Sequence, residues 1–529
     1  MTTVLVVPLF VCMPLNSDTA LFDVQARMAM NGGVLYRDIV EPNLPGIVWI
    51  HMALRSIVGW SSEAIRAVDL LILLGILAIL CRIVSNDRPC WLMVFTAAVF
   101  YATRNEWCHC QRDTWMLLPA LLALLIRIRR SHERDDQTPL VSTVSTADYD
   151  HRVTSDALVR SVAMPLLEGV LWGIAFWIKP HIAIPAVAVF GYSCLTNRVS
   201  GRRKLAEIGL VLAGGCLAAL PGIVWLATSG AWAPFWEMMT EWNPEYLAAG
   251  RQRQSIDRWW MMAVRFHPWW IVHIVAVPLA AKNVMQRFQN KTSANNANIL
   301  PSTELLGVLY LSWTAQSLLL QHAMDYIHVP AILLGIAVVS ASPWTLPVEF
   351  RRIAAGSLLL VGVAVVPTFR PGYLSNWNAC LRHGSTSELR ERLSHGNFPH
   401  WTDIAAVAGF LSKHDASDKD LTCMNVHSVH LFRELGISPA TRYWSVGILH
   451  ELFPSHRSEI QDTVRNQHGR FIVVENDESE LAERCAALDD ILNGMTTVFQ
   501  SGTYRVLAER DDTVATSITA RTKTQGRLN

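Results

Sequence analysis

Charged residues are scarce in this sequence. Asp, Glu, Lys and Arg together make up 17% of its 529 residues, whereas a soluble domain carries roughly 25%. Hydrophobic residues make up 51%. The net charge of +1 argues against a nucleic-acid-binding protein, which would present a strongly basic face. The composition therefore predicts a membrane protein with no nucleic-acid partner.

Several signatures of soluble enzymes are also missing. The sequence has no P-loop, no G-x-G-x-x-G, no internal repeat and no convincingly spaced cluster of metal ligands. Its ten cysteines form no C-x-x-C pair, and Cys108 and Cys110 are separated by a single residue, which suits a disulfide poorly. Burial statistics favour free, buried thiols.

What the sequence does contain is a series of apolar segments. Residues 2–15 are apolar but shorter than the ~20 residues of a bilayer helix. They lack the basic start and small-residue cleavage site of a signal peptide, so we interpret them as a first transmembrane helix. Ten further segments bring the expected number of spans to about eleven: 65–80, 91–103, 115–126, 161–178, 182–195, 208–228, 269–281, 305–320, 327–339 and 353–366.

The loops between these segments predict an orientation. With a cytoplasmic N-terminus, alternate loops carry the basic residues, as the positive-inside rule requires. These inward residues are Arg82 and Arg88, Arg127 to Arg134, Arg198 to Lys204, Lys282 to Lys291, and Arg351 and Arg352. The outward segments are 16–60, 101–113, 179–181, 229–268, 321–326 and everything after Pro371. The inward loop 131–160 is polar and aperiodic, which predicts a flexible insertion.

The outward loop 229–268 is rich in tryptophan and also carries four arginines, against the general trend. The simplest interpretation of the tryptophans is an aromatic belt at the membrane interface. The alternative is stacking on a lipid or sugar, with Arg251, Arg253 and Arg258 holding lipid phosphate. The tryptophans are Trp232, Trp236, Trp242, Trp259, Trp260, Trp269 and Trp270.

The first outward loop, 16–60, is the most informative stretch. Residues 18–30 have apolar residues at helical spacing, a start that Ser17 or Asp18 can cap, and an end at Asn31-Gly32-Gly33. This pattern predicts a helix lying at the membrane interface. A second short helix is expected from Pro45-Gly46 to Val58.

After Pro371 the composition becomes that of a soluble domain. Expected helices cover 401–411, 428–435, 449–464 and 480–492, expected strands cover 421–426 and 470–474, and a hairpin covers 496–509. Strands alternating with helices predict a small α/β domain. We therefore expect a mainly α, polytopic transmembrane domain at 1–370, an extracytoplasmic α/β domain at 371–510, and a disordered tail at 511–529.

Polar residues at the outward ends of the apolar segments are candidates for a site, because they are costly there unless they line a cavity. A carboxylate can activate an acceptor hydroxyl, and cations can stabilise a leaving phosphate. The candidates are Asp18, Asp38, Glu41, Arg112, Asp113, Lys179, His322, Asp325 and Tyr326.

The order of motifs resembles the GT-C superfamily of polyprenyl-phosphate-dependent membrane glycosyltransferases. The resemblance rests on a short helix, an Asp, an interface helix, and then the patterns G-x-x-Y-R-D at 33–38 and P-N-x-P-G at 42–46. Trp-Ile-Lys-Pro at 177–180, Asp-Tyr-Ile-His at 325–328, and the segments 439–443 and 471–474 add to it. The likeness is greatest to the bacterial RgtA/B/C/D-like and dolichyl-phosphate-mannose-protein mannosyltransferase-like enzymes.

The resemblance implies an inverting hexosyl- or pentosyltransferase of the bacterial inner membrane and cell envelope. It implies a polyprenyl-phosphate-linked sugar as donor, a lipid, glycan or protein acceptor outside the cytoplasm, and Asp18 as the catalytic carboxylate. Arg112, Lys179 and His322 would bind the donor phosphate. Many members have a second acidic residue beside the first, where this chain has Thr19. Some members use a divalent metal ion and others do not, so a metal cofactor stays open.

Each candidate also has a plain structural interpretation. Asp18 can be a helix cap, Asp38 and Glu41 can pair with Arg37, and Arg112 can pair with Asp113. Lys179 can reach from an apolar segment to the interface, and His322 can be an ordinary interfacial side chain. A transporter or flippase of lipid-linked glycans and a catalytically inactive relative are the alternative functions. The transporter predicts inverted repeats, which the sequence does not show.

Overall fold

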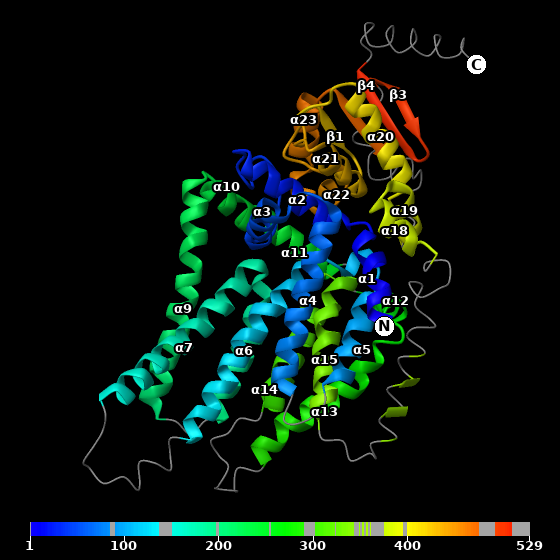
Figure 1. Cartoon of the computed structure of the whole chain (residues 1–529). Helices are drawn as coiled ribbons and strands as arrows, with labels where there is room; N and C mark the ends of the chain where they lie inside the picture. The colour runs from blue at the N-terminus through cyan, green and yellow to red at the C-terminus, as the bar shows by residue number, and fades with distance from the viewer. Residues whose placement is uncertain are drawn as a thin grey trace, which may run out of the picture.

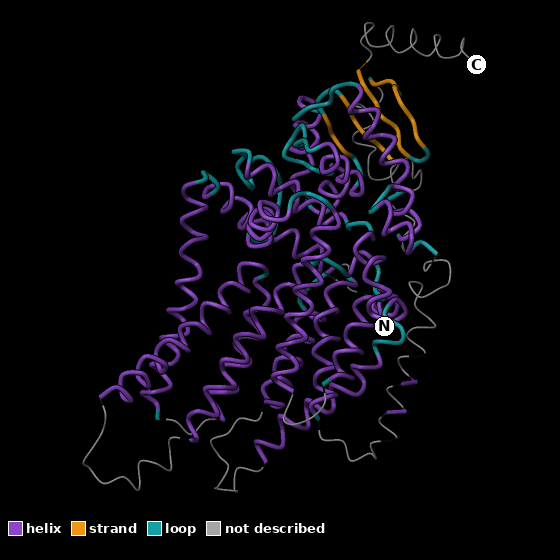
Figure 2. The backbone as a smooth tube through the Cα atoms, viewed as in Figure 1, coloured by secondary structure: helices purple, strands orange, loops and turns teal. Residues whose placement is uncertain are grey.

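The computed structural model describes residues 2–84, 90–136, 151–196, 200–252, 255–289, 302–322, 324–342, 375–394, 399–475 and 494–509, together with residues 349, 352, 353, 356, 357, 360 and 492. Long helices form one end of the molecule, and a small sheet lies at the other (Figures 1 and 2). Short helices fill the region between the two. The expected mainly α architecture with a small mixed α/β part is confirmed at this level.

Helices occur at each expected apolar segment from the first to the tenth. They are α1 (Thr2–Cys12), α4 (Ser62–Val84), α5 (Trp91–Ala102), α6 (Arg112–Asp136), α7 (His151–Ile178), α8 (Ala183–Thr196), α9 (Gly201–Thr228), α13 (Ile271–Gln289), α14 (Ser302–Leu319) and α15 (Val329–Ala341). Almost all of the eleventh segment, 353–366, lies outside the described residues.

Three stretches of the described helices are long and apolar enough to cross a membrane by themselves. They are Ser62–Val84, Ser161–Ile178 and Gly201–Thr228. Five shorter apolar helices of 10–17 residues accompany them. These stretches fit an integral membrane protein, but they do not establish a count of eleven spans.

The ends of the predicted inward insertion are helical, which corrects the expectation for 131–160. Helix α6 continues to Asp136 and α7 begins at His151. The prediction ended each helix where the apolar residues end, although Arg and Glu are good helix formers. Residues 137–150 lie outside the described residues.

The two helices of the first outward loop match their predictions closely. They are α2 (Ser17–Met30) and α3 (Gly46–Val58). The start of α3 packs so tightly against the end of α7 that a Cβ at Gly46 would lie 2.3 Å from the carbonyl oxygen of Trp177. Asp23 and Gln25 of α2 are buried. Helices α3 and α21 (Val429–Leu435) both pack against α2.

The tryptophan-rich segment 229–268 is helical rather than a plain loop. It contains α10 (Trp232–Glu237), the π-helical turn η4 (Met238–Trp242), α11 (Asn243–Gln252) and α12 (Ile256–Arg265). Trp242 and Trp269 are fully buried, so the aromatic-belt interpretation is wrong for these two. The indole of Trp242 stacks on the ring of His456 at 3.7 Å between centroids.

The described residues of the C-terminal part form a four-stranded sheet in the order β1-β2-β4-β3. Strands β1 (Leu421–Cys423) and β2 (Phe471–Glu475) are parallel, whereas β3 (Met495–Ser501) and β4 (Tyr504–Glu509) form the expected hairpin. The helices of this part are α18 (Trp377–His383), α19 (Ser387–Leu393), α20 (Trp401–Lys413), α21, α22 (Val446–Leu452) and α23 (Arg457–Gln467).

Two predictions for this part need comment. The single helix expected over 449–464 is wrong, because the chain breaks into α22 and α23 at Phe453 and Pro454, where proline does not continue a helix. The helix expected over 480–492 and the tail from 511 fall outside the described residues, apart from Leu492.

The first outward loop and the C-terminal sheet share one hydrophobic core. Leu21, Leu35 and Tyr36 belong to the same buried cluster as Phe432 and Ile472. The long helices have a separate buried cluster of their own. The first loop thus packs as a layer between the helical bundle and the sheet.

Candidate active site

Asn16, rather than Ser17 or Asp18, caps the start of α2. Its side-chain oxygen accepts a hydrogen bond from the Thr19 amide at 2.8 Å. Its side-chain nitrogen donates to the carbonyls of Glu106 and His109 at 3.1 and 2.9 Å. These bonds attach the start of α2 to the turn that precedes α6. Because Asn16 performs the capping, the carboxylate of Asp18 is not needed for it.

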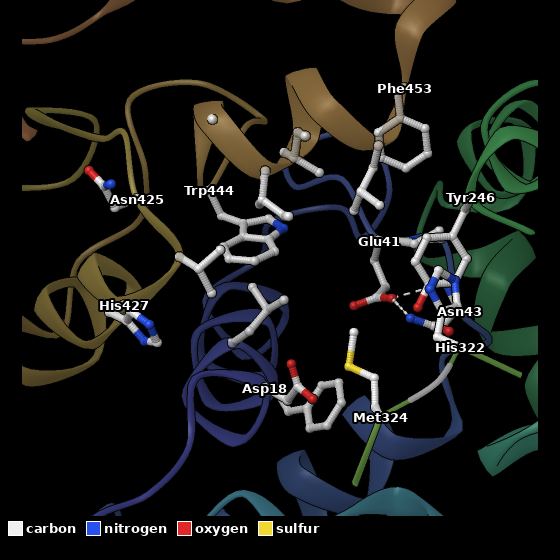
Figure 3. Close-up of a pocket in the computed structure, with 18 of the residues that line it drawn as sticks. Asp18, Glu41, Asn43, Tyr246, His322, Met324, Asn425, His427, Trp444 and Phe453 are labelled. Carbon is white, nitrogen blue, oxygen red and sulfur yellow. Dashed lines mark hydrogen bonds between the residues drawn. The ribbon is translucent and has the colours of Figure 1, made fainter. Parts of the chain in front are cut away.

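Asp18 lies in the first turn of α2, and its carboxylate faces a cavity of about 460 Å³ (Figure 3). This volume falls within the ~300–1,000 Å³ of small-molecule sites. Gln111 donates to Asp18 Oδ2 at 3.4 Å, and Tyr326 hydrogen-bonds to the same carboxylate. Burial raises the pKa of Asp18, while the charge of Arg112 and these two hydrogen bonds oppose the rise. A carboxylate with a raised pKa is suited to accept a proton.

Arg112 supplies the positive charge of this cavity. It is the only arginine or lysine among the described residues that line it. The side chain is buried, with 6% of its surface exposed, and its Nη1 atom has no hydrogen-bond partner among the described residues. The expected pairing with Asp113 does not form, because Asp113 pairs with Lys179 instead. A buried guanidinium nitrogen without a partner is costly unless an anion binds to it.

Glu41 is a second carboxylate that lines the same cavity. It is buried, and its Oε2 accepts a hydrogen bond from Gln25 at 2.8 Å. Its Oε1 accepts from the amide of Asn43 at 2.9 Å and also from the Asn43 side chain. Glu41 does not pair with Arg37, contrary to the plain structural interpretation.

Thr19, the residue next to Asp18, is not among the residues that line the cavity. It is fully buried, and its hydroxyl donates to the carbonyl of Cys110 at 3.4 Å. An acid at this position would point into protein. The second acidic group of the cavity therefore comes from position 41 and not from the neighbour of Asp18.

Tyr246, His322 and Tyr326 complete the side of the cavity around Arg112. The rings of Tyr246 and His322 lie 4.4 Å apart between centroids. Gly250 makes this contact possible, because a Cβ there would lie 2.6 Å from Nε2 of His322. Burial raises the pKa of Tyr246 to about 12, so its phenol keeps its proton at neutral pH.

Other sequence candidates lie away from the cavity lining. Lys179 binds Asp113, with Nζ to Oδ1 at 2.8 Å, and it also contacts Gln321. Asp325 forms an ion pair with Arg265, and the distance from Oδ2 to Nη1 is 3.1 Å.

Asp38 also lies outside the cavity. It pairs with Arg37 at 2.7 Å on the surface, as the plain structural interpretation proposed. The hydrogen bond from Arg37 lowers the pKa of Asp38.

Sequence reasoning missed several cavity residues because they come from segments with no recognisable motif. Tyr246 lies in the tryptophan-rich segment. Gln111, which precedes the charged pair at the start of α6 and donates to Asp18, was missed as well, although it is not among the residues that line the cavity. The residues from the C-terminal part were assigned only to secondary structure. They include Asn425, His427, Trp444 and Glu475.

The described residues do not gather into a metal site. Nowhere in this part of the chain do three or more His, Cys, Asp or Glu side chains come together as ligands for a metal ion.

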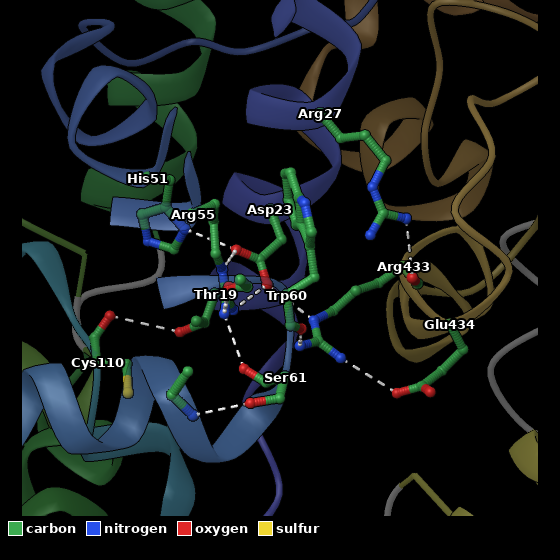
Figure 4. A network of polar contacts seen from close by, with 12 residues as sticks. Thr19, Asp23, Arg27, His51, Arg55, Trp60, Ser61, Cys110, Arg433 and Glu434 are labelled. Atoms are coloured by element: carbon green, nitrogen blue, oxygen red, sulfur yellow. Dashed lines mark hydrogen bonds and ion pairs between the residues drawn. The ribbon is translucent and has the colours of Figure 1, made fainter. Parts of the chain in front are cut away.

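A buried charge network holds the first loop against the C-terminal part (Figure 4). Asp23 on α2 binds His51 and Arg55 on α3 and Arg433 on α21, at 2.9, 2.5 and 2.8 Å. Burial would raise the pKa of Asp23, but the hydrogen bond from His51 and the charge of Arg433 lower it well below the usual range. Asp23 lies less than two helical turns after Asp18, so the network fixes the α2 helix that carries Asp18.

Comparison with solved structures supports the fold assignment. The chain resembles the crystal structure of ArnT from Cupriavidus metallidurans bound to undecaprenyl phosphate, with a TM-score of 0.55, 12% identity and 96% of each chain covered. The apo state of the same protein matches with a TM-score of 0.53 and 14% identity, over 96% of this chain and 95% of that one.

A third match is the cryo-EM structure of the arabinofuranosyltransferase AftD from mycobacteria. Its TM-score is 0.42 at 14% identity, over 96% of this chain and 39% of that one. No protein-family model and no curated protein matches the sequence. The ArnT likeness, at 12–14% identity, shows that the two proteins share a fold.

Proposed function

We propose that this chain is an integral-membrane glycosyltransferase that moves a sugar from a polyprenyl-phosphate donor to an extracytoplasmic acceptor. The observation that carries the proposal is the buried Arg112 guanidinium, with an unpartnered Nη1, in the same cavity as Asp18. An unpaired cation beside a carboxylate of raised pKa is the arrangement that phosphate departure and hydroxyl activation require. The fold shared with ArnT bound to undecaprenyl phosphate supports a lipid phosphate as the donor.

In this proposal Asp18 is the base of an inverting displacement. Its carboxylate takes the proton of an acceptor hydroxyl, and the acceptor oxygen forms a bond to the anomeric carbon of the sugar. The bond between that carbon and the phosphate oxygen breaks, and polyprenyl phosphate leaves with the electron pair. Arg112 stabilises the negative charge that develops on the phosphate, and the protonated phenol of Tyr246 is a second donor to it.

Glu41 has a supporting role in this scheme. With Gln25 and Asn43 already bound to it, its carboxylate is held in one orientation at the cavity wall. Lys179 and Asp113 neutralise each other next to Arg112, so Lys179 is assigned to positioning the start of α6 and not to direct phosphate binding. His322 lines the donor side beside Tyr246.

The proposal includes an orientation. The N-terminus is cytoplasmic, the sheet and the cavity lie outside the cytoplasm, and the donor lipid enters from the outer leaflet of a bacterial inner membrane. The alternation of basic loops supports this arrangement.

Binding of undecaprenyl phosphate to the full chain in nanodiscs tests the proposal. Arg112→Met should weaken binding at least tenfold, which is about 1.4 kcal/mol, because the phosphate loses the one arginine or lysine among the described cavity residues. Arg37→Gln is the matched control, since Arg37 is exposed and pairs only with Asp38. Wild-type affinity in Arg112→Met, with the fold intact by thermal melting, would reject the donor site.

A further inference from the structure

The cavity has two unlike walls. We call the donor wall Asp18, Arg112, Tyr246, His322, Met324 and Tyr326, which come from the first loop, from α11 and from the ends of the bundle helices. We call the roof Asn425, His427, Trp444, Ile448, Phe453 and Glu475, which all come from the C-terminal part. Figure 3 shows Asp18 and Trp444 on opposite sides of the same space.

The roof lies where the sheet most readily forms a ligand site. Asn425 and His427 follow β1, and Glu475 ends β2, the neighbouring parallel strand. Ligands of α/β sheets bind beyond the carboxyl ends of parallel strands. The amide of Glu475 donates to Asn425 Oδ1 at 2.9 Å, which fixes the two strand ends to each other.

The charge of the roof excludes an anion. None of its described lining residues is a lysine or arginine, and Glu475 is acidic. Burial lowers the pKa of His427 to about 4, so this imidazole is neutral at physiological pH. Phosphate is therefore favoured at Arg112 and disfavoured at the roof. Neutral hydrogen-bonding groups fit the roof best.

Trp444 gives the roof an aromatic surface. Its indole is partly exposed and borders the cavity, with Ile448 and Phe453 from the α22 region beside it. A broad aromatic ring flanked by an amide, an imidazole and a carboxylate suits a ligand with an apolar face and hydroxyl groups at its edge. A sugar ring has both.

The roof is also linked to the reacting group. His427 Nδ1 and the hydroxyl of Ser17 are 3.2 Å apart, and Ser17 is the residue next to Asp18. In an inverting displacement the acceptor enters opposite the leaving phosphate. Trp444 lies across the cavity from Asp18 (Figure 3), so a ligand on the roof can direct a hydroxyl group at the Asp18 carboxylate.

We propose that the roof is the acceptor subsite and that the acceptor is a neutral sugar residue of a glycan or glycolipid, stacked on Trp444 with one hydroxyl directed at Asp18. This inference rests on the proposed transfer reaction and adds the chemical class of the acceptor. It assigns specificity to residues of the C-terminal part, which the donor chemistry does not use.

The test measures transfer from a polyprenyl-phosphate sugar to three acceptors: a neutral oligosaccharide, the same oligosaccharide carrying a phosphate, and a Ser/Thr peptide. The full chain is used in nanodiscs. The neutral oligosaccharide should be the preferred acceptor. Trp444→Ala should raise its KM about tenfold, and Trp444→Phe should raise it less, because phenylalanine keeps an aromatic face. Undecaprenyl phosphate binding should not change in either variant.

Trp260→Ala is the matched control, since Trp260 is 72% exposed and lies outside the cavity. Preference for the peptide or the phosphorylated glycan, or an unchanged KM in Trp444→Ala, would overturn the acceptor assignment while the transferase proposal stands.

If wild-type protein transfers no sugar at all, the transferase proposal fails separately, and quenching of tryptophan fluorescence by the neutral oligosaccharide still tests the roof. Quenching that is lost in Trp444→Phe but kept in Trp260→Ala supports a sugar site there, and equal quenching in both variants rejects it.

Discussion

At the scale of single residues, the proposed mechanism depends on the protonation state of Asp18. Burial raises the pKa of Asp18, and the charge of Arg112 together with hydrogen bonds from Gln111 and Tyr326 limits the rise. A base must be ionised to work, so transfer should increase with pH as Asp18 loses its proton. Each group that lowers the pKa extends activity toward acidic pH.

Gln111 therefore offers a direct test of this balance. Gln111→Leu removes a donor to the Asp18 carboxylate and so raises the pKa of Asp18 further. The acid limb of the transfer rate should move to higher pH, so the loss of activity should be largest at acidic pH and should shrink as pH rises. A uniform loss at every pH, with no movement of the limb, would show that Gln111 acts on the fold alone.

Asp18 and Arg112, which the sequence offers as site residues because a polar residue beside an apolar run has few structural reasons to be there, both line the cavity, and their roles stay a prediction. Sequence reasoning could not separate Arg112 from Lys179. Both precede or follow apolar helices, and only the contact between Lys179 and Asp113, 66 residues apart, shows which cation is neutralised. The same is true of Glu41, whose place beside Asp18 depends on the fold of the first loop.

At the scale of elements, the α7–α9 pair shows how small residues set helix packing. A Cβ at Gly214 would lie 2.1 Å from the carbonyl oxygen of Leu166, and one at Gly169 would lie 2.0 Å from that of Val211. The two helices cross with their backbones in contact, as membrane helices do where small residues face each other. Helix α9, with α10 beyond it, leads to the α11 side of the cavity.

Gly214→Ala should accordingly destabilise the protein. The added methyl group must push the helices apart, and overpacking of this kind costs about 1–3 kcal/mol. Gly209→Ala in the same helix has no atom within 4 Å of the new Cβ and serves as the control. Thermal melting in nanodiscs should show a lower Tm for Gly214→Ala only, and equal melting temperatures would argue against the close crossing.

Elements were predictable where a single local signal dominates. The bounds of α3 follow from Pro45-Gly46 at one end and Gly59 at the other, and the β3–β4 hairpin follows from alternation around Gly502. The helices α10 to α12 were missed because their tryptophans suggested a membrane belt. The fully buried Trp242 stacks on His456, a contact across 214 residues that no local pattern contains.

At the scale of the whole molecule, the first loop and the C-terminal part act as one unit. They share a hydrophobic core, and Asp23 binds Arg433 across 410 positions of sequence. Because the pKa of Asp23 is lowered, the stability it contributes is present above the usual aspartate pKa of about 4 and is lost as pH falls toward its lower folded value. The contact is thus intact at physiological pH.

This arrangement encloses the cavity between the donor wall, on the side of the helical bundle, and the roof, on the side of the sheet. A domain boundary at 370 follows composition, yet the packing joins residues from both sides of it. Composition indicates whether a segment is exposed to solvent or to lipid. It does not indicate which loop of the helical part the C-terminal part packs against. That is why the cavity as a whole could not be derived from the sequence.

The measurement that tests the central claim most directly compares Asp18→Asn with wild type for sugar transfer and for undecaprenyl phosphate binding, with Asp38→Asn as the exposed control. Because burial raises the pKa of Asp18, its ionised form does not favour the fold, and the Asn variant should melt no lower than wild type. We predict wild-type lipid binding and a loss of transfer of about 10²–10⁴-fold in Asp18→Asn, and no change in Asp38→Asn. Transfer at the wild-type rate in Asp18→Asn would contradict the account.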